Sequence, residues 1–319
     1  MSNNYIYKLD SDSSILENLS NGILNREIEQ KFIYQWKWAK LYYEDKETNP
    51  MYVGESLESK DFIKMWNKNI KSANEYIAFI SLWCGNSQTE ASILSQTDTK
   101  NVDYYWIDSS VGMLDLTNEN FKNLDVKYKL ISSDFTSRQL RFELEQLTKK
   151  YDKRVFTFFS NTFGNIQHTK IIDILYNLLN KWDKIWLDVR LRKWLSVKDD
   201  LEIVKTVSKD VERPETITSY TRTLTELWVW KNDGELKMKS MKEPSINALK
   251  CEFLYEFHNK STVSVKWDDM IILPGESIKL LRIYIYDAEG LINFFEEHGF
   301  KFLQKQIKWY RWQFLFEKA

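Results

Sequence analysis

Small and polar residues follow an apolar run in the segment FISLWCGNSQTEASIL, and their types and spacing suit nucleotide binding. Residues 76–82 predict a buried strand, residues 84–87 a tight turn and residues 88–94 the first turns of a helix. Such a strand–turn–helix junction leaves backbone N–H groups aimed at one point, which suits a nucleotide or a carboxylate. Asp108 ends the next apolar run, roughly 20 positions after Gly85, where an acid accepts hydrogen bonds from ribose hydroxyls. The loop and the acid together predict a nucleotide-type ligand.

Three further polar motifs come directly after predicted strands, at the edge where open α/β sheets bind ligands. They are Asp134-Phe135 in ISSDFTS, residues 158–167 (FFSNTFGNIQ), and Asp188 in IWLDVR. Asp134 is placed to accept from an adenine amino group while Phe135 packs on the ring. Asp134 would equally serve as the N-cap of a helix over 137–148. Both interpretations stay open at this stage.

Alternating elements must position these residues. Apolar runs alternate with amphipathic segments between about 76 and 190, which predicts five parallel strands with right-handed helical crossovers. The runs read YIAFISL, VDYYWID, VKYKLIS, RVFTFFS and KIWLDVR, and the helical segments between them are 87–96, 110–123, 137–150 and 168–181.

The alternation stops after residue 190. Residues 197–222 predict charged helices, and the Asn-Asp-Gly turn in TLTELWVWKNDGELKMKSMK predicts a hairpin. A second hairpin is predicted around Asn259 and Lys260, and ESIKLLRIYIY adds a further strand. Residues 287–300 predict an amphipathic helix, and the tail that follows predicts a closing antiparallel hairpin.

These elements predict an α/β chain of four parts. Residues 1–70 form a helical segment that contributes to an accessory lobe, and residues 71–194 form a Rossmann-like core. Residues 195–286 form a smaller α+β accessory lobe for substrate, and residues 287–319 complete the core with a helix and a hairpin.

Composition excludes several classes of protein. The 319 residues carry a formal net charge of −1, so no long-range field gathers nucleic acid or an anionic membrane. Three histidines and two distant cysteines do not predict a metal site. His168 and His298 are expected at the surface, and Cys84 as a small apolar residue rather than a nucleophile. Without a signal segment or a membrane-length apolar run, we expect a cytoplasmic protein.

A nucleotide-type α/β half that ends in an antiparallel hairpin is typical of class I methyltransferases that use S-adenosylmethionine (SAM). At its motifs the chain resembles the histidine-specific SAM-dependent methyltransferase family, whose best-known member trimethylates the α-amine of histidine on the way to ergothioneine. The resemblance is collinear from about 76 to 190 and resumes over 273–319.

The family's glycine-rich loop reads roughly Leu-Gly-Ser-Gly-Ser-Ser-Thr-Lys-Thr, and here residues 82–90 read LWCGNSQTE. Its Asp-Val-Ser corresponds to Asp108-Ser109-Ser110 and its Gly-Asp-Phe to Ser133-Asp134-Phe135. Its Gly-Ser-Thr-Ile-Gly-Asn, the most specific match, corresponds to residues 160–165, and its Gly-Glu-x-Ile strand is echoed at residues 275–278. In the family the last Asn of the fourth motif holds the substrate α-amine, so the resemblance implies this role for Asn165.

Two departures from the family pattern concern the ligands. Trp83 replaces the first glycine of the loop, and Ser81 stands where the family has an acid. The Trp83 ring either points into the core or fills the methionine half of the cofactor pocket. Leu281 and Ile283 align with a Glu and a Ser that grip the imidazole, and an apolar wall leaves such a ring unpaired. A larger apolar or aromatic amine is therefore expected instead of histidine, with Arg282 alternatively facing an acidic group.

The sequence and the resemblance together predict a SAM site and an amine site. The predicted cofactor residues are Trp83, Cys84, Gly85, Ser87, Asp108, Ser109, Asp134, Phe135, Ser160 and Asn161. The predicted substrate residues are Asn165, Phe163, Tyr42, Tyr43 and Arg282, with Asn165 in the catalytic role.

The predicted function is a SAM-dependent N-methyltransferase acting on a small amine, an amino-acid derivative or a peptide residue. The alternative is a catalytically inactive relative that serves as a binding or scaffold subunit, because Trp83 and Ser81 depart from the family pattern. An enzyme needs an open cofactor pocket and a second cavity that reaches the methyl group. A scaffold needs neither and would bind a protein partner instead.

Overall fold

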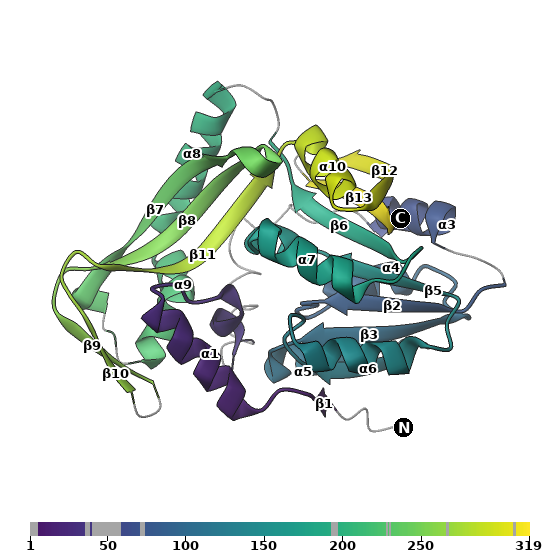
Figure 1. The fold of residues 1–319 in the computed structure, drawn as a ribbon, viewed down its shortest axis with the longest axis horizontal. Coiled ribbons are helices and arrows are strands. Elements are labelled where there is room, and N and C mark those ends of the chain that lie inside the picture. Colours follow the sequence, from purple (N-terminus) through teal and green to yellow (C-terminus); the bar gives the residue numbers. More distant parts are fainter. Residues whose placement is uncertain are drawn as a thin grey trace.

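The computed structural model describes residues 6–35, 39, 59–70, 74–192, 197–227, 229, 231–265, 268–308 and 311–319. Across these residues an eight-stranded sheet forms in the order β1-β4-β3-β2-β5-β6-β13-β12 (Figure 1). Its strands are β1 (Tyr7–Lys8), β2 (Ile77–Leu82), β3 (Val102–Asp108), β4 (Lys127–Ser132), β5 (Lys153–Phe158), β6 (Lys184–Arg190), β12 (Phe300–Lys308) and β13 (Arg311–Lys318). The strands from β1 to β6 are parallel, whereas β13 runs antiparallel to both β6 and β12.

Helices cover both faces of this sheet. They are α3 (Ser59–Asn69), α4 (Gln88–Leu94), α5 (Val111–Phe121), α6 (Arg138–Thr148), α7 (His168–Leu178) and α10 (Ala288–Glu297). Strands β2 and β6 are buried along all or most of their length, as expected where helices lie on both sides of a parallel sheet. The predicted α/β sheet and its closing hairpin are confirmed.

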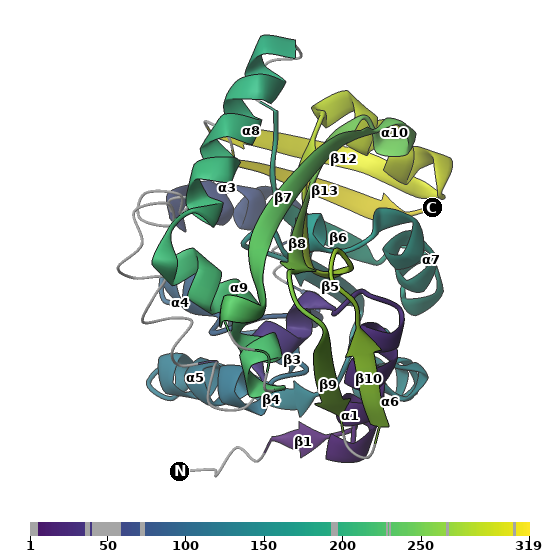
Figure 2. The same cartoon turned by 90° about the vertical axis from the view of Figure 1, so that its left-hand side faces the viewer.

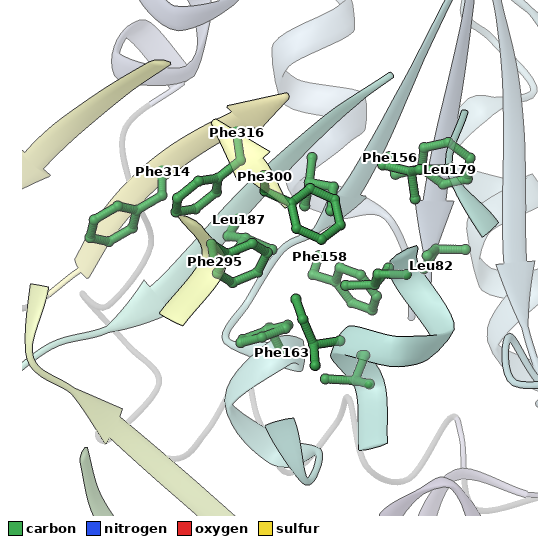
Figure 3. Close-up of a cluster of buried hydrophobic side chains, with 14 of the residues drawn as sticks. Leu82, Phe156, Phe158, Phe163, Leu179, Leu187, Phe295, Phe300, Phe314 and Phe316 are labelled. Atoms are coloured by element: carbon green, nitrogen blue, oxygen red, sulfur yellow. The ribbon is translucent and has the colours of Figure 1, made fainter. Parts of the chain in front are cut away.

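Two apolar layers hold the helices to the sheet. One layer packs α6, α7 and α10 on one face, and the other packs α3, α4 and α5 on the opposite face. Figure 3 shows the first layer, in which the rings of Phe295 on α10 and Phe316 on β13 stack at 4.2 Å between centroids. This aromatic packing fixes the C-terminal hairpin to the parallel strands.

Strand β1 was not predicted, because two residues carry no measurable periodicity. It pairs with β4 at the outer edge of the sheet, and the N–H of Leu9 continues the pairing with the carbonyl of Ser132 at 2.9 Å. This short strand brings the N-terminal segment to the edge where the polar motifs lie.

A second, antiparallel sheet lies beside the first, as the two views show (Figures 1 and 2). It consists of β7 (Gly234–Glu243), β8 (Ala248–Phe257) and β11 (Ser277–Tyr286), in the order β11-β8-β7. The elements around it are α1 (Asp12–Leu24), the 3₁₀ turn η1 (Gln30–Tyr34), α8 (Val197–Val211), α9 (Pro214–Glu226) and the hairpin β9 (Ser261–Val265) with β10 (Asp268–Ile272). Short 3₁₀ turns are η2 (Thr162–Asn165), η3 (Lys231–Asp233) and η4 (Pro244–Ile246).

Both hairpins predicted inside this region were wrong. The first residues of the segment before the Asn-Asp-Gly turn, 223–226, belong to α9, and β7 begins only at Gly234. The turn at Asn259 joins β8 to β9, but β8 pairs with β7 and β11 while β9 pairs with β10. Local turn signals identify strand ends, whereas the pairing partners come from longer-range packing. Within the described chain, no helix is long and apolar enough to cross a membrane.

Candidate functional site

The loop between β2 and α4 contains three left-handed residues in five positions. Trp83, Gly85 and Ser87 have φ angles of 52°, 58° and 51°. Glycine adopts this conformation freely, whereas a residue with a side chain is disfavoured by about 1–2 kcal/mol. The alternation turns the chain sharply at the end of β2, and α4 begins at Gln88. Trp83 therefore adopts a left-handed backbone conformation in which glycine is favoured, and glycine is the residue that the family motif has at this position.

Asp108 lies at the end of β3 and binds this loop directly. One carboxylate oxygen accepts from the N–H of Gly85 at 3.1 Å, and the other accepts from the N–H of Ser110 at 2.8 Å. Burial raises the pKa of Asp108 to about 7, although these backbone hydrogen bonds oppose the shift. Each carboxylate oxygen has a second lone pair, so the group keeps acceptor capacity for a ribose hydroxyl. The structure brings the predicted pair of Gly85 and Asp108 together.

Thr117 on α5 also holds the loop, and the sequence analysis missed it. Its hydroxyl donates to the carbonyl of Gly85 at 2.8 Å and lies 3.2 Å from the hydroxyl of Ser87. Cys84 packs beside it, with its sulfur 3.8 Å from the Thr117 hydroxyl, and burial raises the pKa of that thiol well above its usual value. Cys84 is therefore a neutral thiol that packs in the loop. A threonine nine positions after Asp108 carries no recognisable motif, so no sequence signal marked it.

Asp134, the predicted adenine acceptor, already has a charged partner. Its Oδ2 forms a salt bridge with Lys31 of η1, and its Oδ1 accepts from the N–H of Thr136 at 2.9 Å. Burial opposes both charges, but their mutual attraction prevails: the pKa of Lys31 is raised and the pKa of Asp134 is lowered. Both groups are therefore charged at neutral pH. The N-cap of α6 is Ser137, so Asp134 forms a turn ahead of the helix and does not cap it.

Phe135 lies against the tryptophan of the loop. The rings of Trp83 and Phe135 meet edge to face, with centroids 5.1 Å apart. The indole N–H of Trp83 is buried and has no hydrogen-bond partner among the described residues. Trp83 thus both borders a pocket and packs against the core. The packing against the core agrees with the first alternative considered for this residue, whereas the second, that the ring fills the methionine half of the cofactor pocket, stays a prediction.

The fourth motif forms a tight turn at the end of β5. Ser160 and Asn161 have φ angles of 57° and 63°, and their N–H groups donate to Asp188. The side-chain oxygen of Asn161 accepts from the N–H of Arg190 at 2.8 Å. Asp188 and Asn161 therefore fasten the turn to β6, and this turn positions Asn165 at the end of η2.

Phe163 requires a correction. Its side chain is fully buried and contacts the rings of Phe158, Tyr286 and Phe295. It does not border the pocket that Asn165 borders. Phe163 is therefore a core residue rather than the substrate wall that we predicted.

A pocket opens between the parallel sheet's polar edge, η1 and β11. Its walls include Trp83, Phe135, Asn165, Leu281 and Arg282. Further wall residues are Glu27, Ile28, Glu29, Gln30, Thr136, Ile166, Gln167, Lys170, Ile174, Lys279 and Leu280. The cavity volume is about 80 Å³, and a water molecule needs about 10–15 Å³ by this measure. The pocket brings predicted cofactor and substrate residues together, and its volume is that of a few water molecules.

Charged residues of this pocket are paired with one another. Arg282 forms a salt bridge with Glu27, and its other terminal nitrogen donates to Gln167 at 3.4 Å. Lys279 also contacts Glu27, at 3.2 Å. Glu29 lies 2.5 Å from Lys31 and 3.3 Å from Lys170. Each glutamate therefore has two cationic neighbours.

The two apolar replacements on β11 take different positions. Leu281 borders the pocket, whereas Ile283 is absent from its walls. Both side chains are buried in a cluster with Cys251 and Phe253. The aligned positions that would grip an imidazole are therefore apolar and buried here.

Other predicted residues fall outside the pocket or outside the described chain. Ser109 accepts a hydrogen bond from Gln35 at 3.1 Å. Tyr42 and Tyr43 lie outside the described residues. His168 is buried rather than at the surface: its ring meets Tyr284 and Phe294, and burial lowers its pKa to about 4. Among the described residues, no cluster of side chains could hold a metal ion.

The profile of the family described as "Histidine-specific methyltransferase, SAM-dependent" matches residues 12–189. That span is more than half of the 319 residues, and the chain belongs to this family of SAM-dependent methyltransferases. The Rossmann-like sheet with its antiparallel hairpin is the class I SAM-methyltransferase fold. No curated protein gives a significant sequence match.

Several solved structures are similar at low sequence identity. The PH0226 protein from Pyrococcus horikoshii OT3 is 12% identical with a TM-score of 0.45, over 87% of this chain and 98% of that chain. The CurJ carbon methyltransferase is 11% identical with a TM-score of 0.48, over 96% and 66%. The plantazolicin methyltransferase BpumL, solved with S-adenosylhomocysteine (SAH), is 14% identical with a TM-score of 0.41, over 96% and 100%.

The residues present fit one end of SAM better than the other. Asp108, bound to the loop with spare acceptor capacity, suits the ribose hydroxyls. Trp83 lines the pocket, and its indole N–H is buried without a hydrogen-bond partner among the described residues. At the adenine end, however, Oδ1 of Asp134 already accepts two hydrogen bonds from Thr136, and Oδ2 forms a salt bridge with Lys31.

Proposed function

We propose that this chain is an N-methyltransferase for a small amine, an amino-acid derivative or a peptide residue other than free histidine. The observation that carries the proposal is the position of Asn165, on the pocket wall with Trp83 and Phe135. Among the described residues its side chain has no hydrogen-bond partner. Its amide oxygen is therefore available to accept from a substrate N–H.

In this proposal Asn165 orients the substrate. By accepting from one N–H of the amine, its amide oxygen directs the nitrogen lone pair away from the protein and toward the cofactor side of the pocket. When bound, SAM supplies an electrophilic methyl group. Alignment alone is a large contribution, since well-oriented reactants gain roughly 7–11 kcal/mol over a bimolecular encounter.

The ion pairs in the pocket determine whether a protein side chain can remove the proton from the substrate ammonium. An amine must be neutral to react, and a general base would have to be a group with free basicity. Glu27 and Glu29 border the pocket, but each is already neutralised by two cations. We infer that neither acts as a base and that the amine loses its proton to water before it is aligned. The methylation rate is then expected to follow the neutral fraction of the substrate amine.

Apolar and aromatic walls favour an apolar or aromatic amine. A ring face of Trp83 or Phe135 would stabilise a methylated ammonium, at about 0.5–2 kcal/mol for each cation–π contact. Leu281 supplies no hydrogen bond at a position aligned with the family's imidazole grip. Histidine would leave its ring nitrogens unpaired there, at about 1–3 kcal/mol for each buried group. Arg282 is held by Glu27, and a substrate carboxylate would have to displace that partner.

The proposed division of labour follows the four parts expected from the sequence. Residues 71–194 and 287–319 would bind the cofactor. Residues 195–286, with the helical segment within 1–70, would form the substrate wall. The pocket supports this division, because its walls come from η1 and β11 on one side and from the β2 and β5 loops on the other.

Calorimetry and a methyl-transfer assay test this function. Purified protein is titrated with SAM and with SAH, alongside Asp108→Ala, and then incubated with labelled SAM and a panel of aromatic and aliphatic amines and histidine. We expect SAH binding that Asp108→Ala abolishes, and methylation of an aromatic or apolar amine in preference to histidine. Asn165→Ala should lower kcat/KM about 100-fold with unchanged SAH affinity. Methylation that survives Asn165→Ala at the parental rate would contradict the role of Asn165.

The alternative function, a methyltransferase-like scaffold without catalysis, has one observation in its favour. Trp83 occupies a glycine-type position at a cavity of about 80 Å³. If the parent does not bind SAH but Trp83→Gly does, the tryptophan blocks the pocket and the scaffold function is favoured. If neither protein binds SAH, the cofactor site is assigned wrongly.

A further inference from the structure

The N-terminal segment is attached to the end of the site where adenine is expected. Strand β1 pairs with β4, and the carboxylate of Asp10 accepts from the N–H of Asp134 at 2.5 Å. After helix α1 the chain returns to the same edge of the sheet, where η1 begins at Gln30. In Figure 1 this N-terminal segment, in purple, lies between the two sheets. The adenine end is therefore enclosed by residues that precede the parallel sheet.

Residues 30–35, which we call the strap, touch two consecutive strand ends. The side chain of Gln35 donates to Ser109 at 3.1 Å, and the hydroxyl of Ser110 donates to the carbonyl of Tyr34 at 2.5 Å. Lys31 reaches Asp134 from the same strap. The strap thus spans from the residues beside the ribose acceptor Asp108 to the predicted adenine acceptor.

Lys31 has two acidic neighbours in different surroundings. Its side chain is 8% exposed, Asp134 is 14% exposed, and Glu29 is 42% exposed. The ammonium group contacts both carboxylates, at 2.5 Å in the case of Glu29. If Lys31 leaves Asp134, Glu29 can still hold its charge.

We propose that Lys31 competes with the adenine amino group of SAM for Asp134, so that cofactor binding requires Lys31 to leave Asp134 and keep only its contact with Glu29. The adenine amino group and the Lys31 ammonium are both donors. Both need Oδ2 of Asp134, because Thr136 donates two hydrogen bonds to Oδ1, from its N–H and from its hydroxyl. Cofactor affinity is therefore set by a lysine that lies 103 positions before its acidic partner. This inference rests on the proposed SAM site and names a residue that tunes it.

Calorimetric titration with SAH tests the competition without any methyl transfer. Lys31→Met removes the competing charge and is expected to bind SAH at least tenfold more tightly than the parent. Lys31→Arg keeps the ion pair and should bind within about threefold of the parent. Lys122→Met, which removes an exposed lysine paired with Glu119 on α5, is the matched control and should match the parent. Glu29→Gln removes the second position for Lys31 and should weaken SAH binding.

Hydrogen exchange gives a second readout. Amide protons of the strap should exchange faster when the parent is saturated with SAH, and equally fast in Lys31→Met without ligand. Weaker SAH binding by Lys31→Met would mean that Lys31 holds the cofactor, and equal binding would mean that the two donors do not compete. Each of these two results would overturn the inference. If Lys31→Met fails to fold, Lys31→Arg provides the test, because tighter SAH binding by the arginine variant would also contradict the competition. Absence of SAH binding in every variant would overturn the cofactor site as well, whereas tight binding without methylation of any amine would overturn the proposed function alone.

Discussion

The hydroxyl of Ser81, on strand β2, donates a hydrogen bond of 2.9 Å to the carboxylate of Glu90, on helix α4. Both side chains are buried, at 1% and 4% exposure. The family carries an acid at the position of Ser81 and a threonine at the position of Glu90. By the resemblance to the family motif, this chain therefore has its buried carboxylate on the helix rather than on the strand.

This exchange predicts the stability of a swapped variant. Ser81→Ala removes one donor from a buried carboxylate and should cost about 1–3 kcal/mol. Ser81→Asp should cost more, because it places a second carboxylate beside Glu90. The double variant Ser81→Asp with Glu90→Thr restores one acid and one hydroxyl, and urea unfolding should show that it regains most of the loss. A double variant as unstable as Ser81→Asp alone would mean that the two positions are not interchangeable.

Trp83 predicts an unusual order of stabilities. Both Trp83→Ala and Trp83→Gly lose the contact with the Phe135 ring. Because φ is 52° at this position, the alanine variant keeps the backbone strain and the glycine variant loses it. Trp83→Gly should therefore be more stable than Trp83→Ala by about 1 kcal/mol, as measured by urea unfolding. At Cys84, whose φ is not positive, the order should reverse, and the same order at both positions would argue against strain at Trp83.

The parallel sheet could be predicted from the sequence because short, mostly apolar runs alternate with amphipathic segments. Strands β2 to β6 lie within a few residues of the predicted runs, and Gly85 meets Asp108 as the motif spacing implied. Those features depend on residues that are neighbours in sequence, or on the strand–helix–strand connection that recurs along the parallel sheet.

The parts that could not be predicted depend on contacts between distant segments. Lys31 and Asp134 are 103 positions apart, and no local sequence pattern predicts their ion pair. The two mistaken hairpins had good turn residues, but β8 found both of its partners elsewhere. Phe163 matched a site motif, but its ring packs against Phe295 of α10 in the core. Motif position alone therefore does not tell whether a side chain faces a pocket or the core.

The raised pKa of Asp108 predicts how stability depends on pH. In the folded protein this carboxyl titrates near pH 7, against an ordinary value of 3.8. Between those values the folded state binds more protons than the unfolded state, so the contribution of Asp108 to the free energy of unfolding falls as pH rises from about 4 to 7. Above pH 7 it is level.

Asp108→Asn removes this titration while keeping the shape of the side chain. The free energy of unfolding of the asparagine variant, relative to the parent, should rise between pH 4 and pH 7 and then stay constant. Chemical denaturation at several pH values measures the difference, and His168, which is also buried and titrates at about 4, contributes equally to both proteins. A pH-independent difference would show that Asp108 is ionised throughout, as in a normal carboxylate.

The turn before Asn165 has no space for a side chain at Gly164. A Cβ at this position would lie 2.6 Å from the side-chain amide atoms of Asn161, whose oxygen accepts from the N–H of Arg190. Gly164→Ala must therefore displace the Asn161 amide and break that buried hydrogen bond, at a cost of about 1–3 kcal/mol. Because Asn165 is the next residue, amine methylation should fall as well, while SAH affinity changes little.

Gly275→Ala is the matched control for this substitution. Its φ is +84°, and a Cβ there would meet no atom within 4 Å, so the control carries backbone strain of about 1–2 kcal/mol without a clash. Urea unfolding and methylation of one amine should separate the two variants: both lose stability, but only Gly164→Ala loses methylation rate. Equal loss of methylation in both would mean that general destabilisation, rather than the position of Asn165, controls the rate. A normal rate in Gly164→Ala would mean that the turn relaxes without moving Asn165.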